Sequence, residues 1–263
     1  MLDGLKWRLK PFVERNLFLQ RVGMWAFRNL PLLLPHDADY YALRHFHALP
    51  GSMALFLDVG ANTGLSALSF RRFDRTTPIL SLEPNPSHLP SLERIARSDS
   101  GFRFLLVAAG EEEGELRLHV PAVGSYVLHT MASLSAEELA ASCQRVLTTT
   151  QRRRLRILMF QVPVRRIDSL GLRPSIVKID AEGSEAAILA GGMETIRQSR
   201  PFIMLENNEH NQDDCADLLR DVAYERLVYE RATDAFRRGL TIGRNVFFVP
   251  SERAGELPIL SAG

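Results

Sequence analysis

From residue 54 onward, short apolar runs alternate with helix-like segments. Most of these runs are four to eight residues long, which is typical of parallel strands buried on both faces. Units of this kind wind right-handed into one open sheet. The pattern therefore predicts an α/β fold. The apolar runs are ALFLDV, PILSLEP, FRFLLVAAG, SIVKID and PFIMLE, and the intervening helices are LSALSFRRF, SHLPSLERIARS and EAAILAGGMETIRQS.

The last third of the chain completes this pattern. The segment DDCADLLRDV carries Cys215, Leu218, Leu219 and Val222 at helical spacing, which predicts an amphipathic helix. The runs AYERLVYE and NVFFVP lie close enough in sequence to pair antiparallel. We therefore expect seven main strands, mostly parallel, with an antiparallel last strand.

The chain has 263 residues, enough for one large α/β domain or for two small ones. We expect a helical N-terminal extension at 1–50 and the main domain at 51–263. Residues 111–175 break the alternation. In that insertion GELRLHVP and VPVRRID resemble strands, and the polar stretch between them is partly helical. Residues 144–166 hold seven arginines and no acid, which indicates either a solvated face or a cover that attracts an anionic substrate.

Charge and composition exclude several classes. The net charge of +1 gives no global field for nucleic acid. Two cysteines make no disulfide framework, and no signal peptide or long apolar span is evident, so we expect a cytoplasmic protein. Residues 1–34 mix basic and apolar residues, which fits a membrane-surface helix or a cap on the main domain. The cap is favoured because the apolar positions form no clean stripe.

The stretch FLDVGANTG, at 56–64, places a strand, a tight turn and a helix start in succession. Glycine lets the backbone turn and lets a ligand approach, and such strand ends are where open sheets bind ligands. A dinucleotide fingerprint would need glycine at Asn62 and Leu65. S-adenosylmethionine has no pyrophosphate, so a turn with fewer glycines suffices. The candidate cofactor residues in this turn are Asp58, Gly60, Ala61, Asn62 and Gly64.

The next two strands add candidates for the same ligand. In LSLEPNP, Glu83 lies at the end of the predicted strand, 25 residues after Asp58. A carboxylate there can accept both ribose hydroxyls of an adenosine. Pro84 and Asn85 continue this loop. The run FRFLLVAAG places small side chains, Ala108 and Ala109, where we expect the third strand to end and a flat adenine to fit.

Several separated motifs follow one another over roughly 54–250: FLDVGANTG, LSLEPNP, FLLVAAGEEEGEL, VPVRRIDSL, VKIDAEGSEAAILAGG and RPFIMLE. In this order they make the chain resemble FkbM-type methyltransferases. The resemblance implies a class I, Rossmann-like methyltransferase fold at 51–263 and S-adenosylmethionine as cofactor. It also implies O-methylation of a small-molecule or saccharide substrate, in glycan or natural product biosynthesis. At ENNEH the chain departs from the family pattern, because His210 lies four residues beyond Glu206.

The segment KIDAEGSE, at 178–185, holds the catalytic candidates Lys178, Asp180 and Glu182. It ends a buried strand, and alternation puts Lys178 and Asp180 on one face. These side chains either pair with neighbours or include a base that deprotonates the acceptor hydroxyl. Methylation of bases would call for an Asn/Asp-Pro-Pro-Tyr/Phe motif, and D-A-E-G replaces it here.

Glu206 and Asn207 end the following strand. Together with Asp180 they are similar in type and placement to the metal ligands of catechol-type O-methyltransferases, and three oxygen ligands suit Mg²⁺. We therefore consider a divalent cation at Asp180, Glu206 and Asn207, with Glu206 also a catalytic candidate. A non-catalytic nucleotide-binding module is the alternative function, and an NAD-type oxidoreductase is disfavoured by the missing glycines.

Overall fold

The computed structural model describes residues 35–47, 55–124, 126–128, 131–207, 212–239 and 245–260. The two interpretations of 1–34 and the departure at His210 fall outside the described residues. Among the residues described, no helix is both long enough and apolar enough to cross a membrane.

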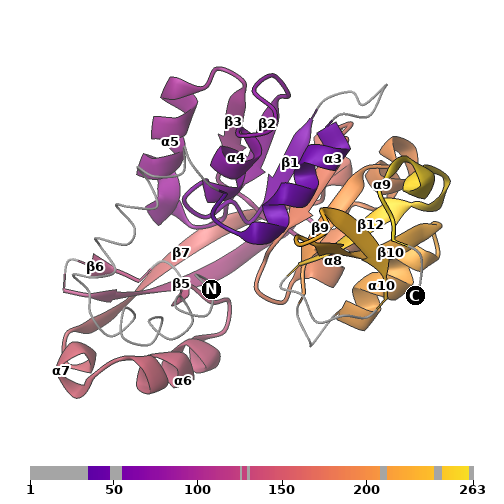
Figure 1. Ribbon diagram of the computed structural model, residues 1–263. Coiled ribbons are helices and arrows are strands. Elements are labelled where there is room, and N and C mark those ends of the chain that lie inside the picture. The colour runs from indigo at the N-terminus through magenta and orange to yellow at the C-terminus, as the bar shows by residue number, and fades with distance from the viewer. Residues whose placement is uncertain are drawn as a thin grey trace.

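The main sheet has eight strands, in the order β11-β10-β12-β9-β8-β1-β2-β3. The five strands from β9 to β3 are mutually parallel, and β12 runs antiparallel to both of its neighbours. Figure 1 shows this sheet across the upper part of the molecule. Its strands are β1 (Phe56–Val59), β2 (Ile79–Leu82), β3 (Phe102–Leu105), β8 (Ile176–Ile179), β9 (Phe202–Glu206), β10 (Tyr224–Glu230), β11 (Ala235–Arg238) and β12 (Asn245–Pro250).

The predicted α/β class and the antiparallel pairing of the last two runs are therefore confirmed. The expected strand number was wrong by one. β11 adds an edge strand through an antiparallel hairpin with β10. Its sequence, AFRR, is too short and too polar at its end to stand out as a strand.

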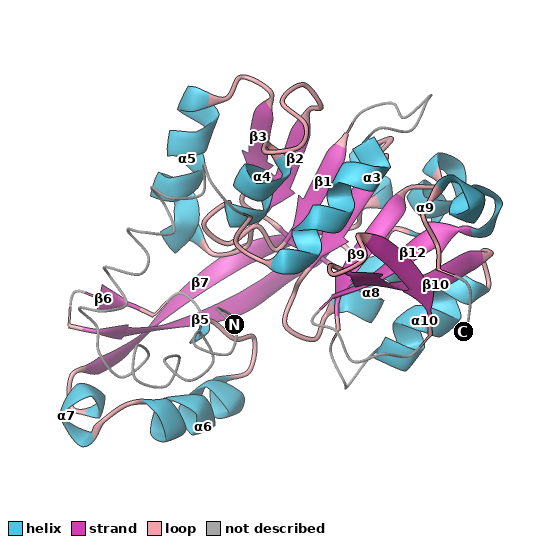
Figure 2. Ribbon diagram, viewed as in Figure 1, coloured by secondary structure: helices cyan, strands magenta, loops and turns pink. Residues whose placement is uncertain are grey.

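Helices cover both faces of this sheet, as Figure 2 shows. The predicted amphipathic helix is α10, where Cys215 and Leu219 are buried. The long helix predicted at 185–199 divides at Gly191 and Gly192 into two shorter ones. One face packs against the 3-10 helix η1 (Ala38–Ala42), α3 (Leu43–His47), α4 (Leu65–Phe70) and α5 (Leu89–Ser98); the other packs against α8 (Glu185–Ala190), α9 (Met193–Ser199) and α10 (Gln212–Arg220).

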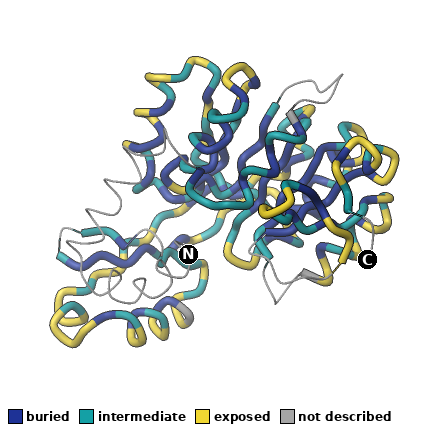
Figure 3. Tube along the Cα trace, in the orientation of Figure 1, coloured by how far each residue is buried: buried dark blue, intermediate teal, exposed yellow. Residues whose placement is uncertain are grey.

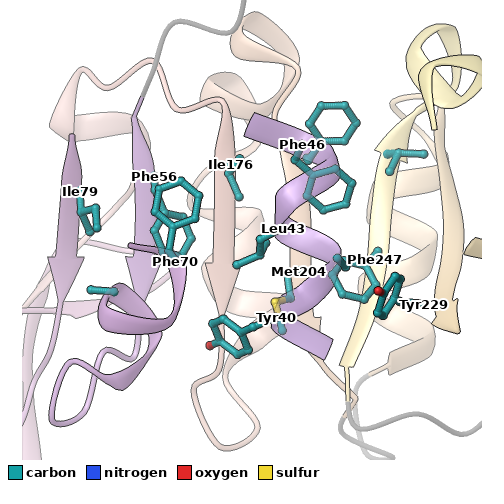
Figure 4. Packing of buried hydrophobic residues seen from close by; sticks show 14 of the residues in the cluster. Tyr40, Leu43, Phe46, Phe56, Phe70, Ile79, Ile176, Met204, Tyr229 and Phe247 are labelled. Carbon is teal, nitrogen blue, oxygen red and sulfur yellow. The ribbon is translucent and has the colours of Figure 1, made fainter. Parts of the chain in front are cut away.

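The segment 35–47 is fastened to the sheet by a core of aromatic rings. Phe46 stacks on Phe202 of β9, with ring centroids 4.5 Å apart and planes only 4° from parallel. Figure 4 shows Tyr40, Leu43 and Phe46 pointing into this core from the short helices. Figure 3 shows the buried backbone running through the centre of the sheet. The N-terminal extension thus contributes at least these residues to the main core.

The insertion forms a second, four-stranded sheet in the order β4-β7-β5-β6. Two long antiparallel strands, β5 and β7, make a ribbon that extends past the carboxyl ends of β1–β3 in the view of Figure 1. Its strands are β4 (Ala108–Ala109), β5 (Gly114–Val123), β6 (Tyr126–Val127) and β7 (Leu155–Arg165), and its helices are α6 (Ala136–Val146) and α7 (Thr149–Arg152).

Two expectations for this region were wrong. The run FRFLLVAAG does not form one strand, because β3 ends at Leu105 and the alanines enter β4 of the second sheet. The stretch LRILMF belongs to β7 and not to the polar, partly helical segment. Strand pairing over ten successive residue pairs with β5 overrides the helix-like polar sequence before it.

Candidate functional site

The carboxyl ends of β1, β2, β8 and β9 meet at one edge of the main sheet, and most of the candidate residues lie there. The registers place Asp58 of β1 beside Ser81 of β2 and beside Lys178 of β8. Glu83 follows β2 directly, Asp180 follows β8, and Glu206 ends β9. The parallel sheet therefore gathers groups that are far apart in the sequence.

Asp58 and Lys178 form a buried ion pair beneath the first turn. Asp58 is 0% exposed, and its Oδ1 lies 3.3 Å from Lys178 Nζ. Asp58 Oδ2 accepts a hydrogen bond of 3.1 Å from Ser81 Oγ. Both oxygens of this carboxylate face groups of the protein, Lys178 and Ser81, so Asp58 organises the turn.

Lys178 also holds the turn through its backbone. Its ammonium donates to the carbonyl oxygens of Val59, at 3.2 Å, and Gly60, at 2.8 Å. Burial alone would lower the pKa of Lys178, but the carboxylate of Asp58 and the neighbouring Tyr40 and Asp180 raise it above its ordinary value. The lysine is thus a fixed cation inside the sheet, 3% exposed, and Asp180 Oδ2 lies 3.7 Å from it.

The glycines of the first turn serve the packing of the protein itself. Gly60 has φ +76°, and a Cβ there would lie 1.9 Å from the backbone oxygen of Asp180. Gly64 has φ +84°, and a Cβ there would lie 2.3 Å from Ile95 Cδ1 of α5. Both positions therefore exclude a side chain because of contacts within the protein. Gly60 thereby brings the first turn against the end of β8.

Glu83 is held by two backbone amides at the mouth of this turn. Its Oε2 accepts a hydrogen bond of 2.6 Å from the Asn62 amide, and its Oε1 accepts one of 2.8 Å from the Asn85 amide. Asn62 has φ +52°, which turns its N–H toward this carboxylate. Burial raises the pKa of Glu83 to about 7, although these two hydrogen bonds lower it. Each oxygen keeps a lone pair for a further donor.

The loop after Glu83 is equally enclosed. Asn85 is buried, and its Oδ1 accepts a hydrogen bond of 3.0 Å from the Ser87 amide, which fixes the orientation of the side chain. Its Nδ2 is buried without a hydrogen-bond partner among the described residues. Pro84 lies between Glu83 and Asn85 in the sequence. A buried donor without an acceptor is costly, so this amide is ready for a ligand acceptor.

Ala108 and Ala109 do not end the third strand of the main sheet, as expected, but pair with Val164 and Arg165 of β7. The residue that ends β3 is Leu105, whose oxygen accepts a hydrogen bond of 3.1 Å from the Glu83 amide. Leu105 is 39% exposed, unusual for a large apolar side chain at this edge. It is therefore a candidate for the apolar surface beside an adenine that the alanines were expected to supply.

The turn after β8 is organised by a residue that sequence analysis did not single out. Glu185 is 0% exposed, and its Oε1 accepts hydrogen bonds from the amides of Ala181, at 2.9 Å, and Gly183, at 3.2 Å. Glu182 is exposed and adopts a left-handed backbone conformation, with φ +51°. The sequence offers two glutamates three residues apart, and only the fold shows which one caps the turn.

The turn brings three carboxylates together. Oxygens of Asp180, Glu182 and Glu206 all lie within 4.8 Å of one another. Asp180 is one-third exposed, so the group is open to a ligand. Asn207 follows Glu206 at the same end of β9. Three carboxylates at this separation can accept a proton or together surround a divalent cation, and Glu182 is a member that the expected metal set lacked.

Tyr40 is a further residue of this edge that sequence analysis missed. It is 3% exposed, its ring lies 4.5 Å from the His36 ring, and its hydroxyl is close enough to Lys178 and the acids to interact with them electrostatically. Burial raises its pKa well above the ordinary value. No local motif indicates a tyrosine that is 138 residues from Lys178 and 140 residues from Asp180 in the sequence, so only the tertiary structure reveals it.

A family model matches about two thirds of the chain. The family described as the Methyltransferase FkbM domain matches residues 58–230, which includes all the turns described above. None of the curated proteins compared with the chain matches its sequence.

Two solved structures align with this chain at low sequence identity. An FkbM methyltransferase from Methylobacillus flagellatus KT shares 17% identity, with a TM-score of 0.48; the match covers 88% of this chain and 59% of that one. This chain thus spans somewhat more than half of that protein. A precorrin-6y C5,15-methyltransferase from Geobacter metallireducens GS-15 shares 12% identity, with a TM-score of 0.39, over 80% of this chain and 84% of that one. The family match, together with the strand order, confirms the predicted class I methyltransferase fold, and the chain belongs to the FkbM methyltransferase family.

Proposed function

We propose that this chain is an S-adenosylmethionine-dependent O-methyltransferase whose acceptor is a hydroxyl of a sugar, a glycan or a natural product. The observation that carries the proposal is Glu83. It is a buried carboxylate at the end of β2, held by two backbone amides and with a lone pair left on each oxygen. That arrangement suits the two adjacent hydroxyls of a ribose.

The residues present fit the cofactor. Glu83 would accept the ribose hydroxyls, and the partnerless Nδ2 of Asn85 would donate to an acceptor on the nucleoside. The turn at 60–64, braced by Lys178, would face the remainder of the molecule. S-adenosylmethionine supplies an electrophilic methyl group, so the protein must align an acceptor with it and exclude water.

The carboxylates at the end of β8 and β9 would act on the acceptor. A sugar hydroxyl is a weak nucleophile, and Asp180 or Glu182 can take its proton as the transfer proceeds. Glu206 would share that proton or orient the base. Lys178 is a positioning residue in this proposal, because its ammonium is enclosed by Asp58 and two carbonyl oxygens.

The alternative form of the site holds a divalent cation such as Mg²⁺. Its support is the separation of the three carboxylates, whose oxygens lie within 4.8 Å of one another. Glu182 would then join Asp180 and Glu206, with Asn207 as a neutral oxygen ligand. In this form the carboxylates would hold the cation, which would supply a Lewis acid beside the acceptor hydroxyl.

The proposal is tested with S-adenosylmethionine carrying a carbon-13 methyl group and a panel of soluble saccharides with free hydroxyls. Nuclear magnetic resonance should detect a new O-methyl signal, and Asp180→Asn should reduce its rate of appearance about 10²- to 10⁴-fold. A signal from an N-methyl group would contradict O-methylation. If the cofactor binds and no acceptor is methylated by the wild-type chain, a non-catalytic module on the same fold becomes the better account.

A further inference from the structure

The outer half of the insertion carries arginines that the proposed methyl transfer does not use. Residues 139–162 contain five arginines and no acid. At the base of the insertion, by contrast, Arg165 pairs with Glu113 and Arg166 pairs with Asp168. Across the part of the chain that the structure describes, none of the five forms an ion pair, and all are exposed: Arg145, Arg152, Arg153, Arg154 and Arg156.

Most of these arginines gather at the outer end of the ribbon. The guanidinium of Arg156 donates to the Gly124 oxygen, at 2.8 Å. The guanidinium of Arg154 also lies at Gly124, since a Cβ there would be 3.3 Å from its Nη2. Arg152 donates to the Gln144 oxygen, at 2.7 Å. These bonds to neutral oxygens hold the guanidinium groups in place and leave their charges uncompensated.

Exposed apolar side chains adjoin this positive end. Met159 is 66% exposed and Ile157 is 43% exposed, and both point to the same face of β7 because they are two residues apart. The strand rises about 3.4 Å per residue, so Met159 lies roughly 17 Å from Arg154. Of the four large apolar side chains exposed within the described residues, three lie in the insertion: Leu134, Ile157 and Met159.

The same face of the ribbon is covered nearer its end. Val123 and Leu155, which pair across the ribbon, are packed with Leu139 and Cys143 of α6. The next pair along this face is Pro121 and Ile157, and α6 does not bury Ile157. The exposed residues thus continue an apolar face beyond the helix that covers its end.

We propose that this tip surface, defined as Arg152, Arg153, Arg154, Ile157 and Met159, docks on a bilayer of anionic phospholipid. Arginine binds phosphate through paired N–H donors, and each basic residue near an anionic bilayer strengthens partitioning about fivefold. A free phosphate ligand would engage the arginines but would have no use for exposed Ile157 and Met159. A lipid surface uses both, because apolar side chains enter the boundary between headgroups and acyl chains. Docking is independent of methyl transfer.

Vesicle flotation of the full chain tests this surface. The chain should float with vesicles enriched in phosphatidylglycerol and not with phosphatidylcholine alone, and salt should weaken the binding. Reversal of three charges in Arg152→Glu, Arg153→Glu, Arg154→Glu should reduce partitioning at least tenfold. The matched control reverses three exposed arginines of the main domain, Arg75→Glu, Arg94→Glu and Arg103→Glu, and should retain binding.

Variants of the apolar residue Met159 distinguish docking from simple charge attraction. Met159→Glu should reduce partitioning at least fivefold, and the conservative Met159→Leu should restore it. Equal loss of partitioning in both triple variants would overturn the proposal. It would also be overturned if neither the triple arginine variant of the tip nor Met159→Glu lost partitioning, and any lipid binding would then lie in another segment such as 1–34. It would also be overturned if Met159→Glu left flotation unchanged but turned a dimer into a monomer, because the face would then be an interface between copies.

Discussion

The ammonium of Lys178 lies 3.3 Å from the carboxylate of Asp58, and both groups are almost completely buried beneath the first turn. The same ammonium donates to the carbonyl oxygens of Val59 and Gly60. One buried cation therefore fixes the end of β1, the start of the turn and the end of β8 relative to one another. The position of the candidate site depends on this pair.

Removal of the Lys178 ammonium should make the protein less stable to unfolding. Lys178→Met leaves Asp58 buried without its partner, and breaking a buried pair in this way costs about 3–5 kcal/mol. Urea denaturation should show this loss in the free energy of unfolding. The double variant Lys178→Met, Asp58→Asn should recover part of it, because no uncompensated charge remains. An equal loss in the single and the double variant would mean that packing, and not charge, makes the lysine necessary.

A side chain at Gly60 should displace the end of β8. Gly60→Ala introduces a Cβ that would lie 1.9 Å from the Asp180 oxygen. Gly171→Ala is the matched control, since Gly171 also has a positive φ, +62°, but nothing lies within 4 Å of its Cβ position. In the control, the free energy of unfolding should fall by only about 1–2 kcal/mol, the cost of a left-handed backbone conformation at alanine. Gly60→Ala should lose clearly more in the same urea titration, and equal losses would show that the close approach does not constrain the turn.

The fold could be predicted wherever short apolar runs end at Gly, Pro or an acid. ALFLDV, SIVKID and PFIMLE contain the strands β1, β8 and β9. FRFLLVAAG misled because no Gly or Pro marks the bend between Leu105 and Ala108, so one apolar run conceals two strands in different sheets. The β7 strand was hidden in part by the arginines before it, which resemble a polar helix.

The candidate site was predictable where one strand end holds one acid. Glu83 and Asp180 follow their strands directly, so their common edge could be expected from the parallel sheet. The functions of the acids next to them, Asp58 and Glu185, could not be predicted from the sequence. Only the packed structure shows that Asp58 faces Lys178 and that Glu185, and not Glu182, accepts the amides of the turn. Tyr40 comes from a distant segment, and no spacing rule connects it to Asp180.

Cofactor binding should depend on pH through Glu83. Burial raises the pKa of this carboxyl to about 7 in the free protein, whereas the ordinary value is 4.5. The folded state therefore holds a proton that the unfolded state loses, and Glu83 contributes a stability that falls as pH rises from about 4.5 through 7. Ribose hydroxyls need the ionised form, so affinity for S-adenosylmethionine should rise over the upper part of this window.

Calorimetry in two buffers with different ionisation enthalpies measures the proton released on binding below pH 7. Glu83→Gln should abolish both the release and the pH dependence that comes from this residue. Glu112→Gln, at an exposed glutamate of the insertion, should leave them unchanged. A pH-independent affinity in the wild-type chain would show that Glu83 does not bind the cofactor as its ionised form.

The carboxylates at the end of β8 and β9 can be examined without knowing the acceptor. If Asp180, Glu182 and Glu206 hold a divalent cation, Mn²⁺ should bind, and its electron paramagnetic resonance signal should diminish on titration with protein. Asp180→Asn and Glu206→Gln should each weaken this binding at least tenfold, and Glu112→Gln should not. If Mn²⁺ does not bind, the metal form of the site is wrong and the general-base form remains.

The central claim is that this chain binds S-adenosylmethionine with Glu83 at the ribose. Titration calorimetry of the full chain with S-adenosylmethionine, its demethylated product and NAD tests it most directly. The account predicts one site for the first two ligands and none for NAD. Glu83→Ala should weaken binding roughly tenfold or more, because two hydrogen bonds of about 1 kcal/mol each are lost, while Glu93→Ala on α5 should not change it. Binding of NAD alone, or equal affinity in Glu83→Ala and the wild-type chain, would contradict the account.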